Sequence, residues 1–190
     1  MKHLITLTLA LFTCSTFAAN QSDIEKLVQQ ASKPTEAVDL SNADLRNYSF
    51  SDSKISLELA NLSHSNLAGM NLTKQNLSGA DLRYADLSHA KLNHANLTGA
   101  DLSHANLSGA ELQQSNLTLA IMEFTTLESA NLQQANLNHA ILKCANLNQA
   151  NLSHANVTKA TISGATFINT TTSDISGYES VIDRQARCAG

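Results

Sequence analysis

Residues 95–114 read ANLTG ADLSH ANLSG AELQQ, four pentapeptides with one shared pattern. Each carries Leu at its third position, Ala two residues before that Leu, and Asn, Asp or Glu between them. An apolar residue keeps this spacing without a gap from Leu62 to Phe167. This apolar residue is the centre of its repeat, and the residue two positions after it is the corner. A regular internal repeat of this kind decides the fold.

A period of five fits neither common regular structure. On an α-helix, five residues turn about 500°, so the centres would spiral over every face. On a flat strand, an odd period would send alternate centres to opposite faces. A chain that turns by a right angle at each repeat instead places every centre and every Ala inside, and it closes a square coil every four repeats. Such coils would stack at the strand spacing of about 4.8 Å.

The corner residues indicate a recurring tight turn. Gly and His are the commonest residues there, and no Val, Ile or Thr occupies a corner between Leu62 and Phe167. Gly, Asn and His tolerate a positive φ, whereas β-branched side chains resist it. We therefore predict a positive φ at each corner.

A looser group of repeats precedes the regular array, with centres at Leu40, Leu45, Phe50 and Ile55. The step from Ile55 to Leu62 is longer than one repeat, which predicts that extra residues interrupt the register near Leu57 to Leu59. Tyr48, Ser53 and Gln75 also replace Ala in its column. The first coil is therefore expected to be the least regular.

The A-(D/N)-L-x-x pattern resembles the pentapeptide-repeat family over about residues 38–172. The resemblance implies an all-β fold, a right-handed quadrilateral β-helix with the centre and the Ala position facing inward. It implies no single activity, because members range from proteins of unknown role to DNA-mimicking partners of type II topoisomerases.

The N-terminus predicts export. Lys2 and His3 precede an apolar run that ends at a small-x-small site, Thr16-Phe17-Ala18, as in a cleaved signal peptide over residues 1–18. A retained hydrophobic anchor and lipidation at Cys14 are the alternatives. After cleavage we expect no stable membrane insertion and a periplasmic or secreted product.

Both ends of a β-helix need covering, because they expose unpaired backbone. Residues 19–37 are predicted as an N-terminal cap, with a short helix over 22–33 that begins at a capping box and stops before Pro34. Residues 173–190, with Tyr178, Val181 and Ile182, are predicted as a C-terminal cap or tail. The alternative role of that tail is a homodimer contact.

The sequence favours no enzyme chemistry. Its net charge of -4 excludes a basic nucleic-acid surface. After His3, all histidines fall at corners, and no two are spaced to lie on adjacent coils of one face: His64, His89, His94, His104, His139 and His154. No nucleophile and base share a motif, and no phosphate loop or zinc spacing occurs. We therefore expect no catalytic residue, no cofactor and no metal site.

Two cysteines remain after the signal, Cys144 and Cys188. Export permits a disulfide between them, and the tail is long enough to return Cys188 to Cys144. Two free thiols are the alternative, because spacing alone cannot show the required geometry.

Sorting every fourth repeat together gives two distinct faces. One carries an unbroken column of Asn, from Asn76 to Asn156, whose side-chain amides can hydrogen-bond to one another. The other combines aromatic and acidic residues with outward Ile. We predict a partner surface on this second face, with structural packing as the alternative, formed by Tyr84, His104, Ile121, Phe124 and Ile141.

The expected function is that of an exported, non-enzymatic module that binds a protein or has a structural role. A DNA-mimicking modulator of a type II topoisomerase is the alternative if the protein is cytoplasmic. That role would need an acidic stripe, and the only neighbouring acidic residues are Asp81, Asp86, Asp101 and Glu111.

Overall fold

The computed structural model describes residues 37–46, 48, 56–181 and 188. The predicted signal peptide at 1–18 and the predicted helix at 22–33 lie outside these residues. So do the proposed centres Phe50 and Ile55, together with Ile182 of the tail.

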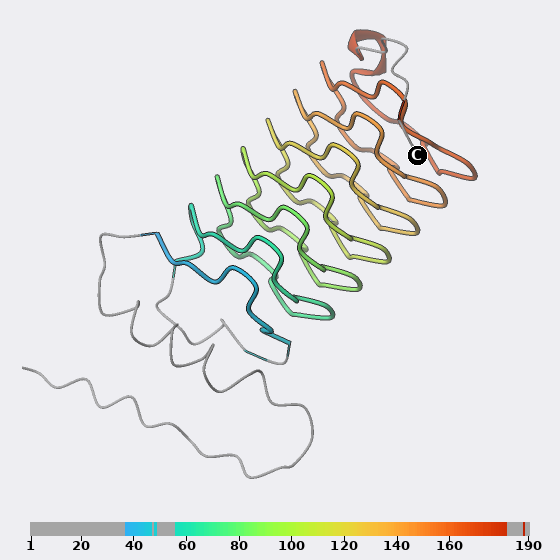
Figure 1. Cartoon of the computed structure of the whole chain (residues 1–190). Helices are drawn as coiled ribbons and strands as arrows, with labels where there is room; N and C mark the ends of the chain where they lie inside the picture. The colour runs from blue at the N-terminus through green and yellow to red at the C-terminus, as the bar shows by residue number, and fades with distance from the viewer. Residues whose placement is uncertain (1–36, 47, 49–55, 182–187, 189–190) are drawn as a thin grey trace, which may run out of the picture.

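The described chain winds into a stack of square coils that forms a rod (Figure 1). Each repeat contributes one bridging residue, directly before the centre, and parallel bridges join it to the residue twenty positions later, as in Asp81 to Asp101 and Asp101 to Ile121. Four repeats therefore make one coil, as the five-residue period predicts. Among the described residues the one helical element is the 3-10 turn η1, Tyr178–Ser180. No described helix has the length and hydropathy that a membrane span requires.

Backbone hydrogen bonds connect each repeat to the coils on both sides. The N–H of Leu102 donates to Ile121 O at 2.7 Å, and the N–H of Asp101 donates to Ala80 O at 3.0 Å. Within the repeat, the N–H of Ala105 donates to Leu102 O at 2.9 Å and closes a four-residue turn. The backbone is thus paired along the rod rather than within long strands, which satisfies its polar groups.

The corner of that turn has the predicted conformation. His104 has a φ of 61°, and every corner from His64 to Asn169 has a positive φ, Gly or not. A positive φ at the third turn residue is typical of a type II turn. Gly has a second use at two corners: a Cβ at Gly109 would lie 2.6 Å from Nδ1 of His89, and one at Gly79 would lie 2.6 Å from Cδ2 of Leu59.

The preference for Asn or Asp before the centre has a local cause. The Oδ1 atom of Asp101 accepts a hydrogen bond from the N–H of Ser103 at 3.0 Å and another from its hydroxyl at 2.6 Å. The same contact recurs at Asn61, Asn96 and Asn151. These side chains form Asx turns, which shape the chain as it enters the corner.

The core is a column of Leu with Ala between its members. Leu62, Leu82, Leu102 and their equivalents are completely buried, as are Ala80 and Ala100. The centre at Phe167 is different, because its side chain is 37% exposed. Only part of one further coil follows it, so Phe167 lines the open end of the interior and is not buried as predicted for a centre.

The register break lies earlier than predicted. Leu57 is a buried centre, and its O accepts the turn hydrogen bond from the N–H of Ala60 at 3.2 Å. Leu59 is its corner residue, with a φ of 57°. Asp39 bridges to Asn61 rather than to residue 59. The two extra residues therefore lie between Leu45 and Leu57. The sequence pattern missed this centre because Ile55 and Ser56 replace the Ala and the Asn or Asp that precede most centres.

Bridged repeats continue beyond residue 172 into the segment predicted as a cap. Asn151 bridges to Thr171 and Asn156 bridges to Ser176. The chain then enters η1, where the hydroxyl of Ser180 accepts a hydrogen bond from the N–H of Lys159 at 2.9 Å. This contact fixes the turn against the preceding coil.

Two Ser residues in the Ala column allow an opposed pair of substitutions. The hydroxyl of Ser65 donates to Leu62 O at 2.6 Å, whereas the buried hydroxyl of Ser115 has no hydrogen-bond partner among the described residues. We expect Ser115→Ala to raise the free energy of unfolding by about 1 kcal/mol and Ser65→Ala to lower it by up to about 1 kcal/mol. Urea unfolding of both variants checks this. Shifts in the same direction would contradict it.

Candidate functional site

The predicted partner surface lies on one face of the rod, here named the ring face. Its repeats stack directly upon one another through the bridged column Asp81, Asp101, Ile121 and Ile141. The corners of these repeats carry the aromatic side chains. The structure therefore brings all five predicted residues onto one face. They lie in two columns, and within each column successive residues are twenty positions apart.

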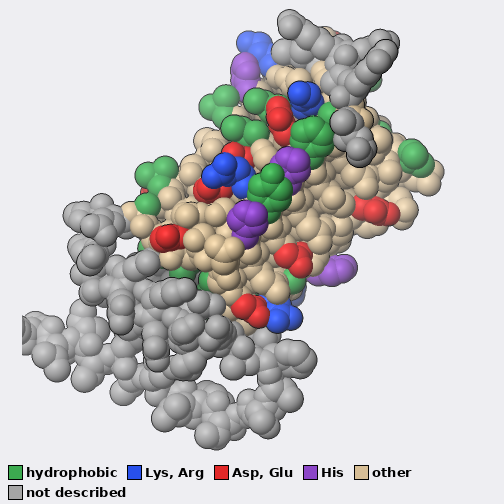
Figure 2. Space-filling model, in the orientation of Figure 1, with side chains coloured by type: hydrophobic (Ala, Val, Ile, Leu, Met, Phe, Trp, Pro, Cys, Tyr) green, Lys and Arg blue, Asp and Glu red, His purple; other side chains and the backbone are tan. Residues whose placement is uncertain are grey.

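Four rings stack along the corner of the ring face. The centroids of His64 and Tyr84 are 4.8 Å apart, those of Tyr84 and His104 are 4.7 Å apart, and those of His104 and Phe124 are 4.9 Å apart, with interplanar angles of 5° to 7°. Figure 2 shows this alternation of His and hydrophobic side chains along the rod. Face-to-face stacking leaves the ring edges toward solvent. His64 is not among the five predicted residues, although its twenty-residue spacing from Tyr84 places it in the same column.

The apolar part of the ring face lies beside the end of this stack. Phe124 is 37% exposed and Tyr84 is 52% exposed. Ile121 and Ile141 are half-buried neighbours in the bridged column. Glu123 follows the centre Met122, and Lys143 follows the centre Leu142. Charged groups of both signs therefore flank the Ile pair. Such a mixture of exposed apolar and charged groups is typical of protein contact surfaces.

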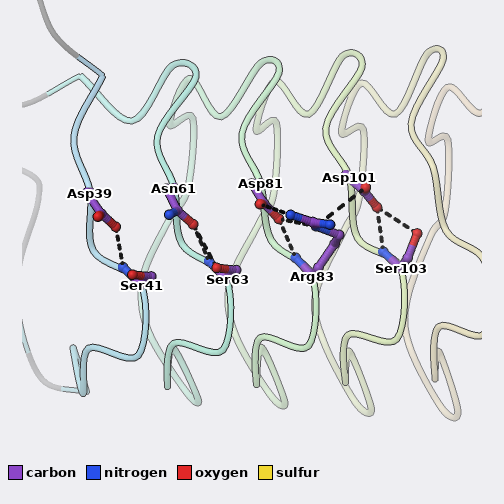
Figure 3. Close-up of polar contacts among 8 residues, drawn as sticks. All are labelled: Asp39, Ser41, Asn61, Ser63, Asp81, Arg83, Asp101 and Ser103. Atoms are coloured by element: carbon purple, nitrogen blue, oxygen red, sulfur yellow. Dashed lines mark hydrogen bonds and ion pairs between the residues drawn. The ribbon is translucent and has the colours of Figure 1, made fainter.

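The polar part of the ring face is built around Arg83 (Figure 3). Its guanidinium donates to both carboxylate oxygens of Asp81, with Nε to Oδ1 at 2.9 Å and Nη2 to Oδ2 at 2.6 Å. It also lies 3.8 Å from Oδ2 of Asp101 in the next coil. The hydrogen bonds from Arg83 hold the pKa of Asp81 below its ordinary value. Arg83 therefore pairs directly with Asp81 and lies near Asp101.

Arg83→Gln is expected to raise the pKa of Asp81 toward its ordinary value, because the bidentate hydrogen bond is lost. In the native protein, the carboxylate of Asp81 stabilises the fold above its unfolded pKa, and this contribution is lost as the pH falls through the lowered pKa. NMR titration of the Asp81 carboxyl carbon measures the shift. An unchanged midpoint in the variant would show that Arg83 does not control this group.

The Asn column on another face is only partly a ladder of amides. The Nδ2 atom of Asn96 donates to Oδ1 of Asn76 at 3.0 Å, and that of Asn156 donates to Oδ1 of Asn136 at 3.3 Å. Asn116 and Asn136 instead donate to the Thr hydroxyls of the preceding coil, at 2.9 and 3.0 Å. These contacts use the side chains within the fold, so this face has a structural explanation.

No metal-binding cluster is found among the described residues. No group of three His, Cys, Asp or Glu side chains lies close enough to hold a metal ion in that part of the chain. The nearest His and carboxylate contact joins Nδ1 of His154 to Oδ2 of Asp174 at 3.8 Å, and both side chains are well exposed.

Cys144 and Cys188 form a disulfide in the structure, with their Cα atoms 5.7 Å apart. Cys144 is the corner that follows Phe124 in the ring-face column, and Gly164 is the next corner along. The bond therefore attaches the end of the chain to the corner that carries the ring stack.

Known proteins share this repeat. The family model described as Pentapeptide repeats matches residues 55–93, 85–123, 95–134 and 130–167, which together make up more than half of the chain. No curated protein matches the chain.

Several solved structures are similar to it. A pentapeptide repeat protein from the Arabidopsis thaliana thylakoid lumen is 29% identical, over 56% of this chain and 67% of that one, with a TM-score of 0.43. Rfr23 from the cyanobacterium Cyanothece 51142 is 32% identical, over 60% of this chain and 64% of that one, with a TM-score of 0.35. The chain thus spans about two thirds of these two proteins.

QnrB1, a plasmid-mediated fluoroquinolone resistance protein, is 18% identical over 70% of this chain and 76% of its own, with a TM-score of 0.48. The repeated motif and the family match over most of the rod agree with each other. The chain belongs to the pentapeptide-repeat family, whose members adopt a quadrilateral β-helix.

Proposed function

We propose that this protein is an exported, non-enzymatic module that binds a partner protein through its ring face. The observation that carries the proposal is the apolar group formed by the exposed Phe124 and the half-buried Ile121 and Ile141 at the end of the ring stack. These side chains lie outside the interior of the rod, which Leu and Ala fill. Export rests on the signal-like sequence of residues 1–18.

A protein suits the ring face better than a nucleic acid does. Exposed aromatic and apolar groups are favoured at protein interfaces, where a central apolar area is ringed by polar groups. Here Asp81 and Arg83 lie at one end of the area, and Glu123 and Lys143 lie beside it. Charges of both signs offer hydrogen bonds to a protein surface without repelling it.

The acidic residues support the topoisomerase alternative less well than the ring face supports binding of another partner protein. Asp81 and Asp101 contact Arg83, the carboxylate of Asp86 accepts a hydrogen bond from Asn106 at 3.1 Å, and that of Glu111 accepts one from Asn93 at 2.9 Å. Asp86 and Glu111 also belong to bridged columns on faces other than the ring face. These groups do not form one acidic stripe, which a DNA mimic would need.

Removal of the apolar group tests the proposal. The triple variant Ile121→Ser, Phe124→Ser, Ile141→Ser is expected to lose at least about tenfold in partner capture from the envelope fraction, because it removes the apolar area that the partner would bury. Circular dichroism should show an unchanged fold. N-terminal sequencing of the fractionated protein tests export at the same time, with a chain that begins at Ala19 as the expected result.

The matched control removes three exposed apolar side chains elsewhere, Leu59→Ser, Leu119→Ser and Ile168→Ser. This variant should keep the partner. If the control loses capture while the ring-face variant retains it, the wrong face has been chosen. If the ring-face variant unfolds, its side chains are structural.

A further inference from the structure

The interior of the rod opens into an apolar cavity of about 360 Å³ at its C-terminal end, here named the end cavity. Its floor is one complete layer of buried centres, Leu142, Leu147, Leu152 and Val157. Figure 1 shows η1 at this end of the coil stack. The lining of the end cavity includes none of the five residues proposed for partner binding, and Leu142 of its floor directly follows Ile141.

The sequence of the last coil explains why the cavity exists. Each earlier coil fills its interior with four large centres, but the last one has Thr172 and Gly177 at two of these positions. Thr172 is exposed, and Phe167 is partly turned to solvent. Gly177 cannot carry a larger side chain, because a Cβ there would lie 2.6 Å from Cα of Thr158. The last coil therefore forms a wall around space that its own side chains leave open.

The chain following this coil turns across the end and makes a pocket instead of a flat edge. The hydroxyl of Ser180 accepts a hydrogen bond from the N–H of Lys159, which fixes η1, and Tyr178 and Val181 then line the cavity. With Tyr178 and Val181 at this end, the last coil presents no flat edge to a second rod. The space suits a small molecule better than another β-helix.

The lining specifies the chemistry of that molecule. It consists of aliphatic and aromatic side chains with the hydroxyls of Thr170, Thr172 and Tyr178 and no charged group. The hydroxyl of Thr170 already donates to Leu147 O at 2.7 Å. An ion would lose its hydration without gaining a partner here. The volume exceeds the roughly 150 Å³ of an apolar cavity that holds benzene, and it lies within the range of small-ligand pockets.

We propose that the end cavity binds one small, uncharged molecule with an aliphatic or aromatic body. This role is separate from partner binding at the ring face. The amphiphile 1-decanol and the neutral dye N-phenyl-1-naphthylamine are suitable probes, because both have an apolar body and no charge.

The test is a fluorescence titration of the oxidised full-length protein with N-phenyl-1-naphthylamine. One saturable site is expected, with displacement by 1-decanol and much weaker displacement by decanoate. Thr172→Trp, which places a large side chain into the cavity, should weaken dye binding by about tenfold or more. Ser173→Trp adds the same side chain at the neighbouring exposed position and should leave binding unchanged.

The outcomes separate this proposal from the function of the ring face. The Ile121, Phe124 and Ile141 triple variant should bind the dye as the native protein does, even though it loses the partner. Absence of a saturable site, equal binding by both Trp variants, or equal displacement by decanoate would each overturn the proposal.

Discussion

Leu112→Asp should lower the free energy of unfolding by about 5 kcal/mol or more, which is enough to disrupt the middle of the rod. Leu112 is completely buried, so the variant both removes apolar packing and places a carboxylate inside without a partner. Every interior layer is shared with the coils on both sides, and the damage should therefore spread to neighbouring coils. Chemical unfolding followed by circular dichroism measures the loss.

Gln114→Asp is the matched control, because it introduces the same charge two residues later at an exposed corner. Asp tolerates the positive φ of that corner, which is 58°. The control should change stability by no more than about 0.5 kcal/mol. Equal losses from the two variants would contradict the inward position of the centres.

The second large effect is expected at the disulfide. Cys188→Ser should destabilise the C-terminal coils by about 3 to 4 kcal/mol, because the bond closes a loop with a sequence separation of 44. Cys144→Ser should have the same effect, and the double variant should add little to either. This non-additivity is the signature of two residues that act through one bond.

Differential scanning calorimetry of the oxidised protein and the three variants provides the measurement. A native protein that melts identically with and without reductant would show that the bond adds nothing to stability. Unequal single variants would indicate that one cysteine has a separate role in packing.

Much of the fold could be predicted because its determinants are local and repeated. A five-residue period admits few ways of burying every centre, and the residues tolerated at the corners identify the turn independently. The composition of the ring face followed from the same arithmetic, since residues twenty apart stack. Leu57 was missed because Ile55 and Ser56 stand before it in place of the Ala and the Asn or Asp that precede most centres.

The contacts of individual side chains required the structure. Sequence spacing places Asn96 and Asn116 in one column, but it cannot show that one donates to Asn and the other to Thr. It cannot show that Arg83 compensates Asp81 and Asp101 either, because that depends on side-chain direction. The end cavity depends on how the chain leaves the last coil, where the repeat no longer determines the path.

The central claim is that the ring face, and no other exposed apolar position, contacts a partner protein. Site-specific photo-crosslinking in the living cell tests it most directly, with p-benzoylphenylalanine placed at Phe124 in one variant and at Leu119 in another. Both positions are exposed corners with a positive φ, so the two variants are structurally matched. We expect one discrete crosslinked protein from position 124 and none from position 119. An adduct at 119 with none at 124 would contradict the account.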